Sequence, residues 1–244
     1  VKDFGNTYIT RVLHMPNIVD PAKSTAVMYD PGTGIFQFVP AQVTFVDGKS
    51  NVHIKRPGNS IYMVIEYQKQ FTVMNGHWAK ADVEKMASNL IVNGTTAELF
   101  DPNLQISRAE FTALLVRGLG LNGNEESGKF SDVDSKAWYA SAVGAAVKAG
   151  IVTGVGEGQF APDQSITRLE MAVMIQRAIV FANPSGAVDT NTVDMTIYED
   201  LATLPSWATE SITDLLSTGV MRGVGSDTFA PMSYATRAEA TVTL

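Results

Sequence analysis

Three tryptophans, the only ones among 244 residues, each begin a copy of one sequence pattern. Counted from each tryptophan, a glycine follows after 16 residues, a phenylalanine after 22, a proline after 24, an arginine after 30 and a glutamate after 32. The three sets are Trp78, Gly94, Phe100, Pro102, Arg108 and Glu110; Trp138, Gly154, Phe160, Pro162, Arg168 and Glu170; and Trp207, Gly223, Phe229, Pro231, Arg237 and Glu239. Such a pattern without gaps indicates a repeat protein whose units stack on one another.

Each unit is expected to contain two helices joined by an extended Phe-x-Pro loop. In the first unit the helices should cover about residues 77–91 and 108–121, and in the second about 137–150 and 168–181. The second helix of every unit begins with a Ser or Thr followed three residues later by Glu, which is a capping box. The expected caps are Ser107, Thr167 and Thr236. Because two short helices cannot bury their apolar faces alone, the three units should share a core.

The arginines occupy a position that helix electrostatics disfavours. Arg108, Arg168 and Arg237 are each the first helical residue, beside the positive end of the helix dipole. Exposed amide donors at a helix start attract anions, and a guanidinium binds a carboxylate through two parallel hydrogen bonds. We therefore expect the arginines to bind a carboxylate. The alternative left open is that each arginine pairs with an acidic residue of a neighbouring repeat.

The other repeated residues are expected to have mainly structural roles. A Trp at the start of an amphipathic helix is expected to pack in the core, with partial exposure to a groove as the alternative. The glycines are expected just past a helix end in the left-handed conformation, and a close approach of ligand to their backbone is a second possibility. The phenylalanines and prolines should pack and stiffen the loops. The candidate ligand-binding set comprises the arginines, their caps, the tryptophans and the glycines: Arg108, Arg168, Arg237, Ser107, Thr167, Thr236, Trp78, Trp138, Trp207, Gly94, Gly154 and Gly223.

Residues 1 to about 70 have the composition of β-strands. Segments rich in β-branched and aromatic residues alternate with turn sequences such as "DPGTG", "DGKS" and "RPGNS". They predict a meander of five or six antiparallel strands. Val52 and Ile54 should share a buried face opposite His53 and Lys55, and residues 61–67 should form a strand covered on both faces. So small a sheet should pack against the rest of the chain or against an upstream part.

Composition argues against several functional classes. A net charge of −7 argues against nucleic-acid binding, and no apolar run approaches the roughly 20 residues that span a bilayer. The absence of cysteine excludes disulfides and thiol catalysis. With three histidines and no nucleophile elbow, P-loop or zinc-protease motif, we expect no enzyme, metal or cofactor. An EF-hand at residues 101–112 is rejected, because Ile106 and Thr112 stand where Gly and Glu are required. The opening at Val1, without a start methionine, suggests a fragment or processed form.

The signatures "ISRAE", "ITRLE" and "ATRAE", together with the opening "HWA", resemble the S-layer homology family over residues 71–244. The resemblance implies a mostly α fold, with three helix-loop-helix repeats in a pseudo-threefold, three-lobed bundle after an N-terminal antiparallel β domain. The expected domains are residues 1–70, 71–125, 126–185 and 186–244. Two departures stand out: "AWYA" replaces "HWA" in the second unit, and "FTVMN" in the first lacks the acidic residue that "FSDVD" and "IYEDL" keep.

The resemblance also implies a function outside the cell. Such modules anchor proteins to the cell wall or surface layer of Gram-positive-type bacteria, without catalysis. The implied partner is a secondary cell wall polysaccharide carrying a 4,6-pyruvate ketal on N-acetylmannosamine. The signature arginine would contact the ketal carboxylate in a groove between adjacent repeats. Two alternatives remain open: a self-assembling module of a surface layer, and the anchor of an exported enzyme whose catalytic domain lies elsewhere.

Overall fold

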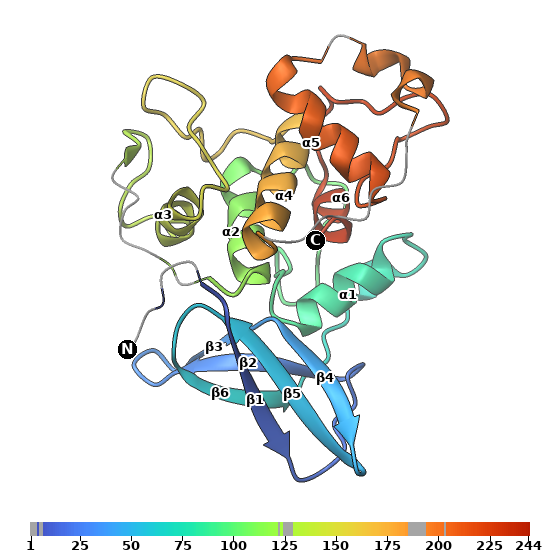
Figure 1. Ribbon diagram of the computed structural model, residues 1–244. Helices are drawn as coiled ribbons and strands as arrows, with labels where there is room; N and C mark the ends of the chain where they lie inside the picture. Colours follow the sequence, from blue (N-terminus) through green and yellow to red (C-terminus); the bar gives the residue numbers. More distant parts are fainter. Residues whose placement is uncertain (1–3, 5–6, 122, 124–128, 185–193, 203) are drawn as a thin grey trace.

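The computed structural model describes residues 4, 7–121, 123, 129–184, 194–202 and 204–244. A β region formed by the first part of the chain lies against one side of a helical region formed by the rest (Figure 1). The expectation of a mostly α fold is wrong, since 32% of the described residues are helical and 21% are in strands. The β region contributes six strands, and each repeat has an extended loop between its two short helices. The expected domain boundaries at 125/126 and 185/186 lie outside the described residues.

The β region consists of two antiparallel three-stranded sheets with strand orders β1-β5-β4 and β3-β2-β6. The strands are β1 (Ile9–Met15), β2 (Ser24–Asp30), β3 (Ile35–Phe38), β4 (Ala41–Val46), β5 (Lys49–Arg56) and β6 (Ile61–Glu66). The number of strands agrees with expectation, but the single meander does not. Only β2–β3 and β4–β5 pair as sequence neighbours, whereas β1 pairs with β5 and β2 with β6 across longer connections.

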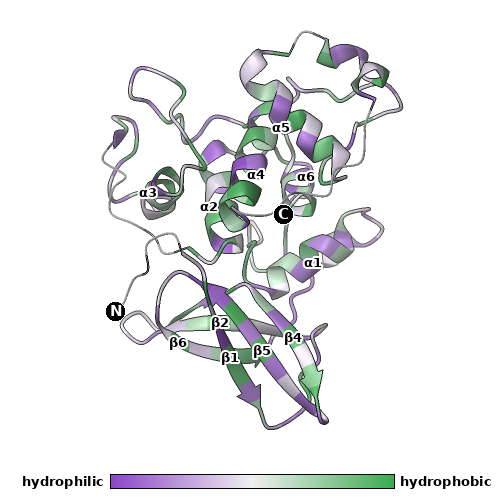
Figure 2. Cartoon of the chain, in the orientation of Figure 1, coloured by the Kyte–Doolittle hydropathy of each residue, from purple (hydrophilic) through white to green (hydrophobic). Residues whose placement is uncertain are grey.

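Side-chain burial follows the expected alternation in β5 but not in β6. Val52 and Ile54 are buried, while Lys55 on the opposite face is exposed, which confirms the one-sided core of this strand. The expectation that residues 61–67 form a strand covered on both faces is wrong, because no residue of β6, an edge strand paired only with β2, is buried. Its first residue, Ile61, is 51% exposed. The C-terminal end of β4 is also hydrophobic (Figure 2), and its last two residues, Phe45 and Val46, are exposed.

The helices that begin with the signatures lie together in the centre, and the other helices surround them (Figure 1). The helices are α1 (Lys80–Ser88), α2 (Arg108–Gly118), α3 (Ala140–Lys148), α4 (Arg168–Ala182), α5 (Ser206–Ser217) and α6 (Arg237–Val242), with 3₁₀ turns η1 (Thr72–Met74), η3 (Met195–Ile197) and η4 (Glu199–Leu201). Each central helix packs on the outer helix of the next repeat: α2 on α3, α4 on α5 and α6 on α1. One hydrophobic cluster therefore includes residues of all three repeats, which confirms the shared core.

The signature segments close the three repeats into a ring. The Ile106 N–H donates to the Ala235 carbonyl (3.0 Å), the Ile166 N–H to the Ile106 carbonyl (3.1 Å) and the Ala235 N–H to the Ile166 carbonyl (2.9 Å). All three residues are buried. Since the third repeat returns to the first, each repeat contacts both of the others, unlike the units of an open repeat array.

The β region is attached to the first repeat by buried polar contacts. The Tyr8 hydroxyl donates to the Leu119 carbonyl (2.7 Å), and Nε of the buried Arg56 donates to the Gly120 carbonyl (3.0 Å). Phe38 of β3 packs against the helical core. The sequence left two packing partners open for the β region, the rest of the chain or an upstream part. The structure shows that it packs against the rest of the chain. No helix in the described part of the chain has the length and hydropathy needed to cross a bilayer.

Candidate functional site: the grooves between repeats

The capping boxes are present at all three signatures. The side chains of Ser107, Thr167 and Thr236 each accept a hydrogen bond from the backbone N–H of the glutamate three residues later, at 3.2 Å. The glutamate carboxylate accepts the N–H of the cap residue in return, at 2.8–2.9 Å. Because these bonds connect residues only three apart, the short sequence motif was sufficient to predict them. The arginines are therefore the first helical residues, as expected.

The amide donors at these helix starts are already occupied. The Arg108 N–H donates to the Gln164 carbonyl and the Ala109 N–H to the Pro162 carbonyl, both in the loop of the next repeat. The same pair of bonds recurs at the other two helix starts. The Arg168 N–H donates to the Ser233 carbonyl and the Leu169 N–H to the Pro231 carbonyl. The Arg237 N–H donates to the Leu104 carbonyl and the Ala238 N–H to the Pro102 carbonyl. The expectation that exposed amides form an anion site is therefore wrong, since closing the ring of repeats uses these donors.

Each signature arginine reaches the capping-box glutamate of the next repeat in the ring. Nη1 of Arg108 lies 3.4 Å from Oε1 of Glu170, and Nη1 of Arg168 lies 3.2 Å from Oε1 of Glu239. Nη1 of Arg237 completes the ring, 3.3 Å from Oε1 of Glu110. The alternative left open by the sequence, pairing with an acidic residue of a neighbouring repeat, is what the structure shows.

The guanidinium groups have further contacts in common. Nη2 donates at 2.8 Å to a carbonyl of the next repeat, from Thr153, Arg222 or Asn93. Each guanidinium also lies over the ring of the repeated phenylalanine, 4.8–5.1 Å from its centroid. These rings belong to Phe160, Phe229 and Phe100, which are all buried as expected. The phenylalanines therefore support the arginines as well as filling the core.

Burial sets the electrostatics of the arginines. Arg108 and Arg168 are only 7% and 5% exposed, and burial lowers the pKa of each below its ordinary value while the partner glutamate opposes the shift. Guanidinium groups remain charged in proteins, so these are buried cations. Nε of Arg168 donates to the Phe229 carbonyl, whereas Nε of Arg108 is buried with no partner among the described residues.

The tryptophans point to solvent. Trp78, Trp138 and Trp207 are 65%, 61% and 58% exposed, so the expectation of core packing is wrong and the alternative of an exposed position holds. The following residue takes the core position in two repeats, where Ala79 and Ala208 are fully buried. An alanine there brings the helix close to the core and leaves the preceding indole outside.

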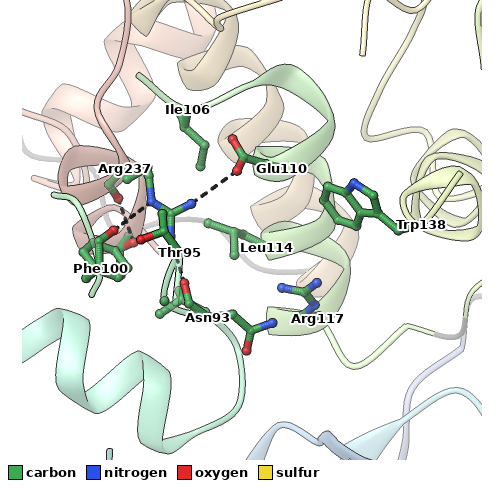
Figure 3. Close-up of a pocket in the computed structure, with 12 residues that line it drawn as sticks. Asn93, Thr95, Phe100, Ile106, Glu110, Leu114, Arg117, Trp138 and Arg237 are labelled. Atoms are coloured by element: carbon green, nitrogen blue, oxygen red, sulfur yellow. Dashed lines mark hydrogen bonds and ion pairs between the residues drawn. The ribbon is translucent and has the colours of Figure 1, made fainter. Parts of the chain in front are cut away.

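Arginines and tryptophans of different repeats meet in two grooves. The first has a volume of about 440 Å³ and is lined by Arg237 of α6, Glu110 and Arg117 of α2, and Trp138 (Figure 3). The second, of about 590 Å³, is lined by the corresponding residues one repeat further on: Arg108, Glu170, Arg177 and Trp207. Figure 3 shows Trp138 and Arg117 across the first groove from Arg237.

Sequence reasoning missed the second arginine of each groove. Arg117 and Arg177 follow the signature arginines by nine residues and the capping-box glutamates by seven. The spacing of seven places each of them two turns further along the helix on the same face as the glutamate. This spacing in the first two repeats was the available signal. Nη1 of Arg117 donates to the Ile91 carbonyl at 3.2 Å, and the charge of Arg177 contributes to lowering the pKa of Arg108. Each groove is thus lined by two arginines and one glutamate, so the net charge of its lining side chains is positive.

The repeated glycines have a different role from the one expected. None of Gly94, Gly154 and Gly223 is left-handed; that conformation occurs four residues earlier, at Leu90, Gly150 and Gly219, with φ of 61°, 72° and 71°. A Cβ on the repeated glycines would instead lie 2.3–2.5 Å from a carbonyl oxygen or an aromatic carbon. They are required where the loop backbone passes close to itself and to an aromatic ring. Gly94 and Gly154 also line the two grooves.

The acidic residues of the repeat openings hold the loops that support the arginines. Asp132 accepts the N–H groups of Phe160 and Ala161 (2.8 and 2.7 Å), and Asp200 likewise holds the corresponding residues of the third repeat. Ala161 and its counterpart Ala230 are left-handed, with φ of 59°. The first repeat lacks this aspartate and has Asp101 at the left-handed position, where its carboxylate accepts from the Thr95 hydroxyl. No cluster of metal-ligating side chains occurs in the described ranges.

Comparison with known proteins agrees with this repeat geometry. The S-layer homology domain family matches residues 71–112, 129–172 and 197–241. An amylopullulanase from Thermoanaerobacterium thermosulfurigenes is 35% identical over 228 residues, which are 93% of this chain and 12% of the relative. An S-layer protein of Bacillus thuringiensis subsp. finitimus is 30% identical over 167 residues, covering 67% of this chain and 19% of the relative. A cellulosome-anchoring protein of Acetivibrio thermocellus is 30% identical over 152 residues, covering 61% and 33%.

The chain thus spans well under two thirds of the length of these relatives. The family matches cover all three signature repeats, and two of these relatives are named for surface layers or anchoring. The chain belongs to the S-layer homology family and is a cell-surface anchoring module of a cell-wall-associated protein.

Proposed function

We propose that the grooves between repeats bind a secondary cell wall polysaccharide that carries a 4,6-pyruvate ketal on N-acetylmannosamine. One observation carries the proposal: in two grooves a signature arginine, a second arginine and an exposed tryptophan line the same hollow. Buried cations recognise an anionic substituent, and an indole provides a flat apolar surface for a sugar ring. The cations distinguish a pyruvylated sugar from a neutral one, and the indole binds the sugar ring itself.

The carboxylate of the ketal binds between the two arginines of a groove. The signature arginine is held by its glutamate, its phenylalanine ring and a backbone carbonyl, so it cannot turn freely to enclose a ligand. It is therefore a pre-organised cation, and ligand binding costs little side-chain entropy at this position. Arg117 and Arg177 supply the additional positive charge that attracts the carboxylate into the partly buried groove.

The remaining candidate residues support this site in different ways. Trp138 and Trp207 stack on the sugar, and Trp78 is proposed to do the same beside Arg168. Gly94, Gly154 and Gly223 leave room next to the arginine-binding loop. The role of Ser107, Thr167 and Thr236 is to position other residues, because their capping hydrogen bonds fix the helix start that carries both the arginine and the glutamate. We propose that residues 71–125, 126–185 and 186–244 act as one binding unit.

The chain itself is proposed to anchor and not to catalyse. The amylopullulanase relative is named as an enzyme, yet this chain corresponds to only 12% of its length. A catalytic or structural cargo would therefore lie elsewhere in the same polypeptide. The grooves, with their arginines and indoles, would hold that cargo on a bacterial wall of Gram-positive type, outside the cell.

A pull-down with purified wall sacculi tests this function. The chain should bind untreated sacculi, and binding should be lost after chemical removal of the secondary polymer. A polymer freed of its pyruvate should bind more weakly, because the carboxylate is gone. The double variant Trp138→Ala and Trp207→Ala should also bind more weakly, by about ten-fold if the two stackings act together. The control Phe45→Ala removes an exposed aromatic side chain on β4, far in sequence from the grooves, and should bind normally.

Two outcomes would contradict the proposal. Undiminished binding to sacculi stripped of polymer would indicate peptidoglycan or a protein as the partner. Equal affinity for polymer with and without pyruvate would remove the carboxylate from the mechanism and leave only neutral sugar recognition.

A further inference from the structure

The first groove adjoins a second hollow, which lies between the β region and the repeats. This hollow has a volume of about 380 Å³ and is lined by β3, by the C-terminal half of α2 and by the start of α3. Asn93, Arg117 and Trp138 line it as well as the first groove, so the two spaces share one wall. The exposed indole of Trp138 lies where they meet. The second groove differs, because every residue that lines it comes from the repeats.

The β3 wall is held firmly in place. Gly120, beside this hollow, is left-handed (φ 63°), and a Cβ there would lie 2.6 Å from Cδ of Pro40, just after β3. The Gly120 carbonyl accepts from the buried Arg56 of β5, and Phe38 of β3 itself reaches the helical core. A wall attached by buried contacts can present its side chains to a ligand with little loss of entropy on binding.

The chemistry of the hollow suits a sugar. On the β3 side, Ile35 and Phe36 are 54% and 41% exposed, and the next residue of β3, Gln37, is also exposed and lines the hollow. On the repeat side lie Trp138, Arg117 and Ser141. A pyranose has apolar C–H faces and a rim of hydroxyl groups, and it would find both aromatic surfaces and hydrogen-bonding side chains here.

We propose that the β region forms an additional sugar-binding subsite, which takes the residues of the wall polymer adjacent to the pyruvylated sugar in the first groove. The inference rests on the proposed function, because the hollow adjoins the first groove and shares Asn93, Arg117 and Trp138 with it, which favours the same saccharide chain as the occupant. The β region then contributes directly to anchoring, and the first groove recognises a longer stretch of polymer than the second.

Isothermal titration calorimetry with two saccharides tests the subsite on the full chain. The probes are pyruvylated N-acetylmannosamine as a monosaccharide and a trisaccharide of N-acetylhexosamines that ends in it. The trisaccharide should bind at least about five-fold more tightly, the equivalent of about 1 kcal/mol. Phe36→Ala and, separately, Gln37→Ala should remove most of this gain and leave monosaccharide affinity within about two-fold.

Ile61→Ala is the matched control. Ile61 of β6 and Phe36 of β3 pair with the same residue, Tyr29, from the two strands that flank β2, and both are exposed. The control should keep the full gain with saccharide length. Phe36 also packs its ring on Tyr29, with centroids 5.2 Å apart, so thermal unfolding of each variant is measured in parallel. Gln37→Ala leaves this ring pair intact, so it tests the contribution of β3 to saccharide binding even if Phe36→Ala destabilises the sheet.

Photo-crosslinking locates the bound saccharide. A trisaccharide with a diazirine on the sugar farthest from the ketal should label residues 35–37. Labelling confined to the repeats, or equal affinity for the two saccharides, would overturn the subsite while monosaccharide binding still supports the proposed function. Absence of binding by either saccharide would overturn both.

Discussion

Glu110 binds Arg237 through one carboxylate oxygen and caps its own helix through the other. Oε1 lies 3.3 Å from Nη1 of Arg237, and Oε2 accepts the Ser107 N–H at 2.8 Å. One side chain therefore links the first turn of α2 to the start of α6, and Glu110 and Arg237 lie 127 residues apart in sequence. Since Glu170 and Glu239 do the same, each capping box is also a joint between two repeats. The signature arginine is consequently part of the fold as well as of the groove.

Arg168→Ala should destabilise the protein. Arg168 is buried and contacts Glu239, two backbone carbonyls and the Phe229 ring, so its loss leaves acceptors without a donor. We expect the free energy of unfolding to fall by about 2–3 kcal/mol, measured by urea denaturation. An unchanged midpoint and slope would show that these contacts contribute nothing net to the fold, and that the arginine serves the ligand alone.

Arg177→Ala should separate binding from stability. Arg177 lines the second groove, has no hydrogen-bond or ion-pair partner among the described residues, and its charge disfavours the charged form of Arg108. Its removal should leave the free energy of unfolding within about 0.5 kcal/mol and reduce affinity for pyruvylated polymer about five-fold. Urea denaturation and calorimetry on the same preparation check both. Normal affinity in the variant would exclude Arg177 from the binding site.

Gly223→Ala should unfold more readily than its neighbour Gly225→Ala. A Cβ at Gly223 would lie 2.5 Å from Cε1 of Tyr198 and 2.7 Å from the Thr228 carbonyl oxygen, whereas at Gly225 the nearest atom is 4.0 Å away. Neither glycine has a positive φ, so conformation is not the difference. Overpacking should cost the first variant about 1–3 kcal/mol, while thermal unfolding of the second should match the wild type. Similar unfolding temperatures for both variants would contradict the steric argument.

Lowering the pH should destabilise the loop of the second repeat, because the Asp132 carboxylate that holds it becomes protonated. Burial tends to raise the pKa of this carboxyl, but hydrogen bonds from the backbone N–H groups of Phe160 and Ala161 lower it below its ordinary value of 3.8. The stabilisation is therefore complete above that value and is lost as the pH falls through the lower folded-state pKa.

The Asp132→Asn variant provides the test. It should be less stable than the wild type at pH 7, and the difference should shrink as the pH is lowered below about 3.8. Thermal unfolding followed between pH 7 and pH 2 measures both curves. A constant difference across this range would mean that the charge of Asp132 does not contribute.

The sequence by itself determined what depends on near neighbours in the chain. The capping boxes at Ser107, Thr167 and Thr236 were predicted because they join residues three apart. The alternation of Val52 and Ile54 was predicted because strand periodicity is local. The family signatures are likewise short, and they were sufficient to identify the repeats and to indicate the anchoring role.

Only the tertiary structure decided what the repeated residues contact. The amides at each helix start donate to another repeat, and each arginine pairs with a glutamate 62 to 127 residues away. Trp138 is exposed whereas Ala140, two residues on, is buried, and Gly154 is required by a ring and a carbonyl that come from two different loops of its own repeat. Closure of the three repeats into a ring brings each arginine to its glutamate, and the repeated spacing does not say which residues pair between repeats.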